Sequence, residues 1–163
     1  MSLHARINFI EGSNDAVFEM VIQHVPLNHY IRNLEEMIHV MKRELPSVSI
    51  VLITPPPIDE VKLSRRNENL GKQIVIDRSN ERTFEYVSAV IDVGQRYNLP
   101  VLNIFEACEG RSSRREDYLV DGLHLNERGN LKLFEELLAI ISKFYPKFDE
   151  LQTDQPHWSE LNR

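Results

Sequence analysis

Apolar residues recur along the chain with two spacings, which distinguish the expected helices from the expected strands. In three stretches they return every three or four positions, the period of an amphipathic helix. Proline or a polar turn sequence follows the first two stretches, as is usual where a helix ends. The expected helices cover residues 27–45, about 74–97 and 131–144. The middle helix is expected to turn inward Phe84, Val87, Val90 or Ile91, and Gly94.

Three short, mainly apolar runs alternate with these helices. Residues 48–53 are rich in β-branched side chains and stop before three consecutive prolines, which is typical of a buried parallel strand. Residues 5–10 and 101–105 are the other expected strands, and the polar residues 59–72 are expected to form a loop. The alternating order of strands and helices predicts an α/β fold with a parallel sheet and right-handed crossovers.

A carboxylate stands three residues before a histidine in the segment Asp121-Gly122-Leu123-His124. In a tight turn, which Gly122 would permit, Asp121 can accept a hydrogen bond from Nδ1 of His124 and leave Nε2 free as a base. In the competing interpretation Asp121 caps the following helix and His124 is merely exposed. Chance matches to such short motifs are common, so both interpretations stay open on these four residues.

A second polar segment, Gly-Ser-Asn-Asp at residues 12–15, directly follows the first expected strand. The amide of Asn14 can donate a hydrogen bond to a developing oxyanion, and Gly12 would allow close approach of the backbone. Asp15 could cap a following helix or pin the loop. An ordinary polar turn has the same composition. Because ligands of parallel α/β sheets bind beyond the carboxyl ends of the strands, this segment and the Asp121–His124 motif are expected at one edge of the sheet.

Taken jointly, the two motifs resemble those of the SGNH (GDSL-type) hydrolases, and within them the isoamyl acetate-hydrolysing esterases. Residues 12–15 match the Gly-x-Asn-Asp block of that family, and Asp121 with His124 matches its Asp-x-x-His block. Similar segments lie at residues 23–34, 51–57 and 121–130, and the resemblance runs from about Ile7 to Trp158. It implies a three-layer, flavodoxin-like parallel sheet in the strand order 2-1-3-4-5. It also implies hydrolysis of short acyl esters by Ser/His/Asp acyl-enzyme chemistry.

By this resemblance His124 is the general base, Asp121 orients it, and Asn14 and Gly12 belong to the oxyanion site. No cofactor is implied, and His24, His29 and His39 lack the partners and spacing of a metal site. The chain departs from these esterases at Glu11, where they usually carry an apolar or aromatic residue.

The Gly-Asp-Ser block that would carry the nucleophile is absent from the 163 residues. The resemblance places it, with the first βαβ portion of the fold, before Met1, so that this chain supplies strands three to five. Ser13 and Cys108 are the internal candidates for a substitute nucleophile. Ser13 would compete with the oxyanion for space, and a lone cysteine is usually a small buried apolar residue.

Two classes of function follow from these observations. In the first, the chain belongs to a carboxylic ester hydrolase and is inactive by itself because it lacks the serine. In the second, it is a non-catalytic binding or pairing protein derived from such an esterase. Acyl transfer would use the same residues as hydrolysis.

The composition bears on the partners and the cellular location of the chain, and it leaves the inferred chemistry unchanged. A net charge of -6 argues against nucleic acid as a partner, and basic clusters at 65–66 and 111–115 are interpreted as solvated loops. A single cysteine favours a reducing compartment, no apolar run is long enough to span a membrane, and a cytoplasmic location is expected.

One hydrolase-like domain over residues 1–147 and a tail over 148–163 are expected. A small-molecule ester is the expected substrate, and the apolar edge of strand 5–10 suggests self-association.

Overall fold

The computed structural model describes residues 7–8, 13–69, 77–110 and 114–146. Gly12, Glu11 and the expected tail therefore lie outside the described residues, as do parts of the first expected strand. The secondary structure elements are, in chain order, β1 (Ile7–Asn8), α1 (Leu27–Glu44), β2 (Ser49–Ile50), β3 (Leu52–Ile53), α2 (Glu60–Asn69), α3 (Asn80–Tyr97), β4 (Val101–Leu102), α4 (Ile104–Glu109), η1 (Arg115–Asp117) and α5 (Glu127–Phe144).

The strands are short and parallel, and the segment formed by β2 and β3 lies in the middle. β1 pairs with β2, where Ile7 faces Ser49, and β3 pairs with β4, where Leu52 faces Val101. Because Val51 alone separates β2 from β3, this one segment has a strand partner on each side. The α/β fold with a parallel sheet, expected from the alternating pattern, is confirmed.

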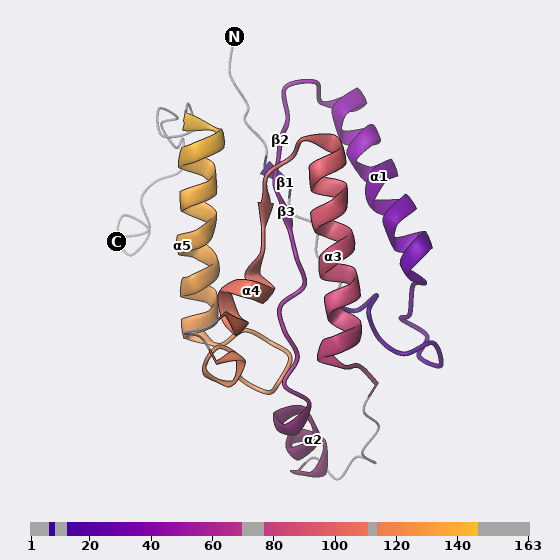
Figure 1. Cartoon of the computed structure of the whole chain (residues 1–163), viewed down its shortest axis with the longest axis vertical. Coiled ribbons are helices and arrows are strands. Elements are labelled where there is room, and N and C mark those ends of the chain that lie inside the picture. Colours follow the sequence, from indigo (N-terminus) through magenta and orange to yellow (C-terminus); the bar gives the residue numbers. More distant parts are fainter. Residues whose placement is uncertain (1–6, 9–12, 70–76, 111–113, 147–163) are drawn as a thin grey trace, which may run out of the picture.

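Helices cover both faces of the strands, which gives three layers (Figure 1). Side chains alternate along an extended segment, so Ile50 and Leu52 face one layer while Val51 faces the other. Ile50 and Leu52 pack in a core with Leu34 of α1 and Val90 of α3. Val51 packs with the residues contributed by β4, α4 and α5, namely Leu102, Ile104, Cys108, Leu133, Leu137 and Ile140.

The first two long helices follow the expected pattern, with one exception in the inward face. Helix α1 begins directly after Pro26 and buries Tyr30, Leu34 and Ile38. Helix α3 begins later than expected, at Asn80, because the Ser79 side chain accepts a hydrogen bond from the backbone of Arg82 and caps it. The buried face of α3 includes Val87, Val90 and Gly94 as expected.

The prediction that Phe84 faces inward was wrong. Its side chain is 53% exposed, and its ring flanks Phe105 with the ring centroids 5.6 Å apart. The neighbouring turn of α3 instead buries Thr83 and Tyr86. The hydroxyl of Tyr86 donates to the carbonyl of Val25, so the polar end of this large side chain is satisfied within the core.

Two further expectations from the sequence were wrong. Residues 59–72 were expected to be a loop, but Glu60–Asn69 form α2, whose Lys62 backbone N–H is capped by the Asp59 carboxylate at 3.1 Å. Strand 101–105 was expected to continue to Phe105, but β4 ends at Leu102. There the Asn103 side chain accepts a hydrogen bond from Glu106 N and starts α4.

Helix α5 has apolar residues on two of its sides. Leu133, Leu137 and Ile140 pack against the sheet, whereas Leu131 and Phe134 are 55% and 56% exposed. The hydroxyl of Tyr145 donates to the carbonyl of Ile50 at 2.9 Å and fastens the end of the helix to β2. Among the described helices, none combines the length and apolar character that crossing a membrane requires.

Replacing Gly94 with alanine is expected to destabilise the fold, because a Cβ at this position would overlap Cγ2 of Val101. Overpacking costs about 1–3 kcal/mol, of which the better helix propensity of alanine returns up to about 1 kcal/mol. Urea unfolding followed by circular dichroism measures the difference. The exposed neighbour Gln95→Ala is the control, and adding Val101→Ala to Gly94→Ala should recover much of the loss. A Gly94→Ala chain as stable as wild type would contradict this packing.

Candidate active site

The Asp121 carboxylate is the centre of the candidate site. Its Oδ2 accepts a hydrogen bond from Nδ1 of His124 at 2.8 Å. Its Oδ1 accepts the backbone N–H groups of Leu123 at 3.0 Å and of His124 at 2.9 Å. With Nδ1 as the donor, Nε2 is the ring nitrogen left to act as a base, and the His124 side chain is 64% exposed. The hydrogen bond expected from the sequence between Asp121 and Nδ1 of His124 is therefore present.

One part of the competing interpretation, that Asp121 caps the last helix, is wrong. The cap of α5 is Asn126, whose side chain accepts a hydrogen bond from Gly129 N at 3.0 Å. Asp121 instead uses both carboxylate oxygens on its own turn. The two roles are thus divided between two residues.

The surroundings of Asp121 favour its charged form. Partial burial raises the pKa of this carboxyl, but hydrogen bonds from the backbone and ring of His124 and from the backbone of Leu123 outweigh that effect. The pKa of Asp121 therefore lies below its ordinary value. A carboxylate that is ionised at neutral pH can hold the His124 tautomer and stabilise the imidazolium.

Helix α2 supports the turn that carries this pair. Gly122 has a φ of 90°, and a Cβ there would lie 2.5 Å from Asp59 O and from Leu63 N. The Asp59 N–H donates to the Gly122 carbonyl at 2.9 Å. The ammonium of Lys62 donates to the carbonyl of Leu119, just before the turn. Gly122 thus permits the tight turn, as expected, and lets the turn rest directly on α2.

Arg66 of α2 reaches the same carboxylate, and the sequence reasoning missed it. Its Nη1 lies 3.1 Å from Oδ2 of Asp121. The basic cluster at 65–66 was interpreted as a solvated loop, because the helix that carries it was not recognised. Asp59 followed by Glu60, after the proline run, is a helix-start signal that would have revealed α2.

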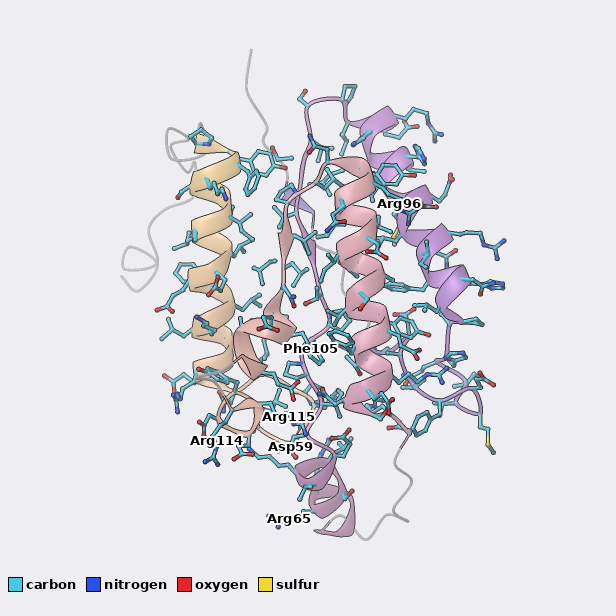
Figure 2. The ribbon with its side chains drawn as sticks, in the orientation of Figure 1. Asp59, Arg65, Arg96, Phe105, Arg114 and Arg115 are labelled. Carbon is cyan, nitrogen blue, oxygen red and sulfur yellow. The ribbon has the colours of Figure 1, made fainter. Side chains whose placement is uncertain are left out.

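The second basic cluster is also engaged in part. Figure 2 shows Arg115 near Asp59, where α2 begins. Arg115 forms ion pairs with Glu109 at 2.6 Å and Glu60 at 3.7 Å, so it links α2 to the end of α4. The interpretation as a solvated loop was therefore wrong for Arg115, while residues 111–113 lie outside the described residues.

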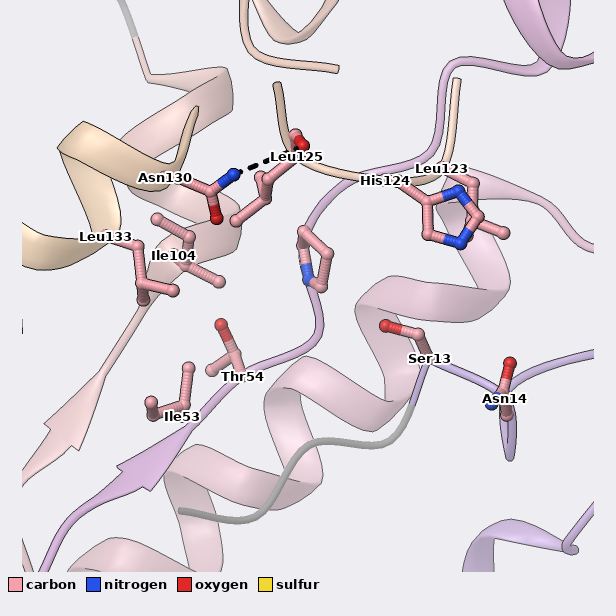
Figure 3. Close-up of a pocket in the computed structure, with 11 residues that line it drawn as sticks. Ser13, Asn14, Ile53, Thr54, Ile104, Leu123, His124, Leu125, Asn130 and Leu133 are labelled. Carbon is pink, nitrogen blue, oxygen red and sulfur yellow. Dashed lines mark hydrogen bonds between the residues drawn. The ribbon is translucent and has the colours of Figure 1, made fainter. Parts of the chain in front are cut away.

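A pocket of about 480 Å³ brings the two motifs together (Figure 3). Ser13 and Asn14 form one wall, and Leu123, His124 and Leu125 form another. The pocket also reaches the end of β3 at Thr54 and is otherwise lined by Ile53, Pro56, Ile104, Asn130 and Leu133. An amide and an imidazole therefore face one cavity with an apolar inner wall, and Asp121 supports the imidazole.

A closed loop holds Asn14 at the pocket. The carbonyl of Asp15 accepts hydrogen bonds from Val25 N and from Nδ1 of His24, each at 3.2 Å. The backbone of Asp15 therefore helps to hold this loop closed. Asp15 caps no adjacent helix, because the next helix, α1, begins only at Leu27. Burial raises the pKa of the Asp15 carboxyl, an effect opposed by its own backbone and by His24.

The two internal candidates for the nucleophile lie in different surroundings. The described hydrogen bonds of His124 go to Asp121 and to the Val120 N–H. Ser13 lines the pocket beside Asn14. Cys108 is fully buried on α4, and burial raises the pKa of its thiol to about 11, opposed weakly by Lys132. A protonated, inaccessible thiol does not attack an ester.

A metal centre is not apparent within the described ranges, where no three histidine, cysteine or acidic side chains are grouped as ligands.

Comparison with known proteins places this geometry in a family. The model of the GDSL-like lipase/acylhydrolase family matches residues 5–132. The chain is 30% identical over 157 residues to a GDSL esterase/lipase of Arabidopsis thaliana, covering 93% of this chain and 65% of the relative. It is 32% identical over 153 residues to the mouse (Mus musculus) isoamyl acetate-hydrolysing esterase 1 homologue, covering 92% of this chain and 59% of that protein.

A solved structure agrees with these relatives. The lipase/acylhydrolase from Enterococcus faecalis superposes with a TM-score of 0.60 and 29% identity, covering 92% of this chain and 64% of that one. The chain thus spans less than two thirds of the length of the relatives that it matches. Because the family model covers well over half of the chain and includes both motifs of the site, the chain belongs to the GDSL-like lipase/acylhydrolase family.

Proposed function

We propose that this chain is the base-bearing part of a carboxylic ester hydrolase of the SGNH type. The observation that carries the proposal is the Asp121–His124 pair, whose imidazole faces the same pocket as Asn14. His124 acts as the general base, Asp121 orients it, and Asn14 donates to the oxyanion. Gly12 is proposed as a neighbouring part of the oxyanion site. The nucleophilic serine is proposed to come from a Gly-Asp-Ser segment outside the 163 residues.

The chemistry follows from these roles. Nε2 of His124 accepts the proton of the serine hydroxyl while the serine oxygen attacks the ester carbonyl. The tetrahedral oxyanion accepts a hydrogen bond from Asn14, a kind of contact worth about 10²–10³ in rate. The imidazolium then gives its proton to the departing alcohol, which leaves an acyl-serine. Water repeats the sequence with His124 as base and releases the carboxylic acid.

The pocket favours a short acyl group as the substrate. Its inner wall is apolar, formed by Ile53, Ile104 and Leu133, and can accept a small hydrocarbon chain. The named esterase relatives are consistent with this class of substrate.

A non-catalytic pairing role is the second candidate, and one observation favours it. Within the described residues, β1 pairs with β2 on one side, and no strand is described on its other side. An unpaired strand edge is a template for association with another chain. The role is tested by the same measurements as the esterase.

The 163-residue chain is expected neither to hydrolyse p-nitrophenyl acetate above the rate of free imidazole nor to react with a fluorophosphonate probe. Serine proteases that lack triad members still accelerate hydrolysis by at most about 10³–10⁴-fold over water, and this chain has only a base and an oxyanion donor. Hydrolysis is followed by absorbance and labelling by mass spectrometry. Labelling of Ser13, in stoichiometric amount, would show that the nucleophile has been misplaced.

Supplying the missing part is expected to restore activity. A chain extended upstream by a Gly-Asp-Ser strand and helix from an isoamyl acetate-hydrolysing esterase should hydrolyse short acyl esters. In it, His124→Ala should lower kcat by at least about 10³ with little change in unfolding midpoint, because the ring is at the surface and not in the core. His29→Ala, an exposed histidine outside the site, is the control. An inactive extended chain that sediments as a folded monomer would reject the esterase. Association of the 163-residue chain in the same sedimentation experiment would favour the pairing role.

Asp121 is expected to contribute stability that disappears in acid. Its pKa is lowered in the folded state, so the stabilisation is present above the pKa of the unfolded chain and is lost as pH falls through the folded value. Asp121→Asn should lower the free energy of unfolding by about 1 kcal/mol at pH 7 and by progressively less below pH 4. Urea titrations from pH 7 to 3 measure this, with Asp92→Asn as an exposed control. A pH-independent difference would contradict the assigned charge.

A further inference from the structure

Arg66 binds the acid–base pair from a different element of the fold. Its guanidinium Nη1 lies 3.1 Å from Oδ2 of Asp121, the oxygen that also accepts the Nδ1–H of His124 at 2.8 Å. The guanidinium and the imidazole therefore meet on one carboxylate oxygen, with these nitrogens at most about 6 Å apart. Oδ1 accepts two backbone N–H groups, so three contacts of the carboxylate come from its own turn and the fourth comes from Arg66 of α2.

The position of Arg66 is set by the docking of α2. Asp59 and Leu63 of this helix region lie against Gly122, and Lys62 holds the carbonyl of Leu119. The Arg66 side chain is 42% exposed, but it extends from a helix that is already anchored on both sides of the Asp121 turn. Less conformational freedom is therefore lost in forming this ion pair than in a pair between two independent surface side chains.

We propose that Arg66 is a positioning residue of the proposed esterase site, which holds the Asp121 carboxylate toward His124 and keeps the imidazole uncharged at lower pH. Its meaning for catalysis rests on the proposed function. The carboxylate alone favours the imidazolium, since opposite charges attract. A guanidinium on the same oxygen opposes that effect through repulsion between like charges. Arg66 thus makes His124 a somewhat weaker base. In return, the imidazole stays unprotonated, and able to accept a proton, over a wider pH range.

Most of the other charged groups around the turn have partners of their own. On α2, the Lys62 ammonium binds backbone carbonyls, and the Asp59 carboxylate caps the helix. On the first turn of α5, the guanidinium of Arg128 lies over the Tyr118 ring, and Glu127 has no ion pair among the described residues. In the loop behind Asn14, Asp15 lies beside His24. Within the described part of the chain, Asp121 is the ionic partner of His124 and Arg66 is the added charge.

The test is a pH titration of the His124 ring by NMR on the 163-residue chain, which needs no turnover. The Cε1–H signal is assigned by its loss in His124→Ala. Arg66→Gln is expected to raise the midpoint of this titration by about half to one pH unit at low salt. Asp121→Asn should shift it in the opposite direction. The shift caused by Arg66→Gln should shrink in 1 M NaCl, because exposed charges are screened.

Two matched variants separate the specific contact from a change in net charge or in helix stability. Arg66→Lys keeps the charge and should leave most of the wild-type midpoint in place. Arg65→Gln removes one charge from the preceding position of α2, labelled in Figure 2, for which no ion pair is described. It should change the midpoint much less than Arg66→Gln. Arg66→Met repeats the test with the aliphatic part of the side chain retained, if glutamine loosens the helix.

An unchanged or lowered midpoint in both Arg66→Gln and Arg66→Met would overturn the proposal, as would an equal shift in Arg65→Gln. In the extended, active chain, the acidic limb of the kcat/KM profile should move upward by the same amount as the NMR midpoint. Inactivity of that chain would reject the proposed function but leave the NMR result to decide whether Arg66 controls the charge of His124.

Discussion

The candidate site depends on the absence of a side chain at residue 122. The Asp121 turn approaches the first turn of α2 so closely that a β-carbon on Gly122 would lie 2.5 Å from two backbone atoms. This approach allows Asp59 and Lys62 to bind the backbone on either side of Asp121. It also brings the guanidinium of Arg66 to the carboxylate. A larger residue would separate the turn from the helix, and the acid–base pair would lose its support even with both of its own residues intact.

The sequence was informative where one strong physical signal acted alone. The spacing of apolar residues predicted α1, because it buries one stripe against the sheet. It also predicted the last helix, although α5 packs Leu133, Leu137 and Ile140 on the sheet and leaves Leu131 and Phe134 exposed. It failed for α2, a short polar helix that is stabilised by its Asp59 cap and by contacts to distant residues. It failed also for Phe84, because two faces of α3 carry apolar residues and burial depends on which neighbours reach each face.

The same difference explains what could be predicted of the site. Asp121 and His124 are three residues apart, so their contact is local and the sequence alone predicts it. Arg66 lies 55 positions earlier in the chain than Asp121, and its contact exists only because two elements dock. The pocket shared by Asn14 and His124 was inferred from a rule of parallel sheets, not from any property of the residues themselves. The spacing of residues along the chain could not predict how elements that are distant in the sequence dock on one another.

The buried position of Cys108 gives the fold a natural reporter of its own opening. It is the only cysteine in the chain, and its side chain is buried where α4 packs against the sheet and α5, with Lys132 of α5 nearby. A thiol in this position reacts with an external disulfide only during moments when these layers separate. The rate at which Cys108 is modified in the unaltered chain therefore measures how often α4 and α5 separate from the sheet. No engineered label is needed.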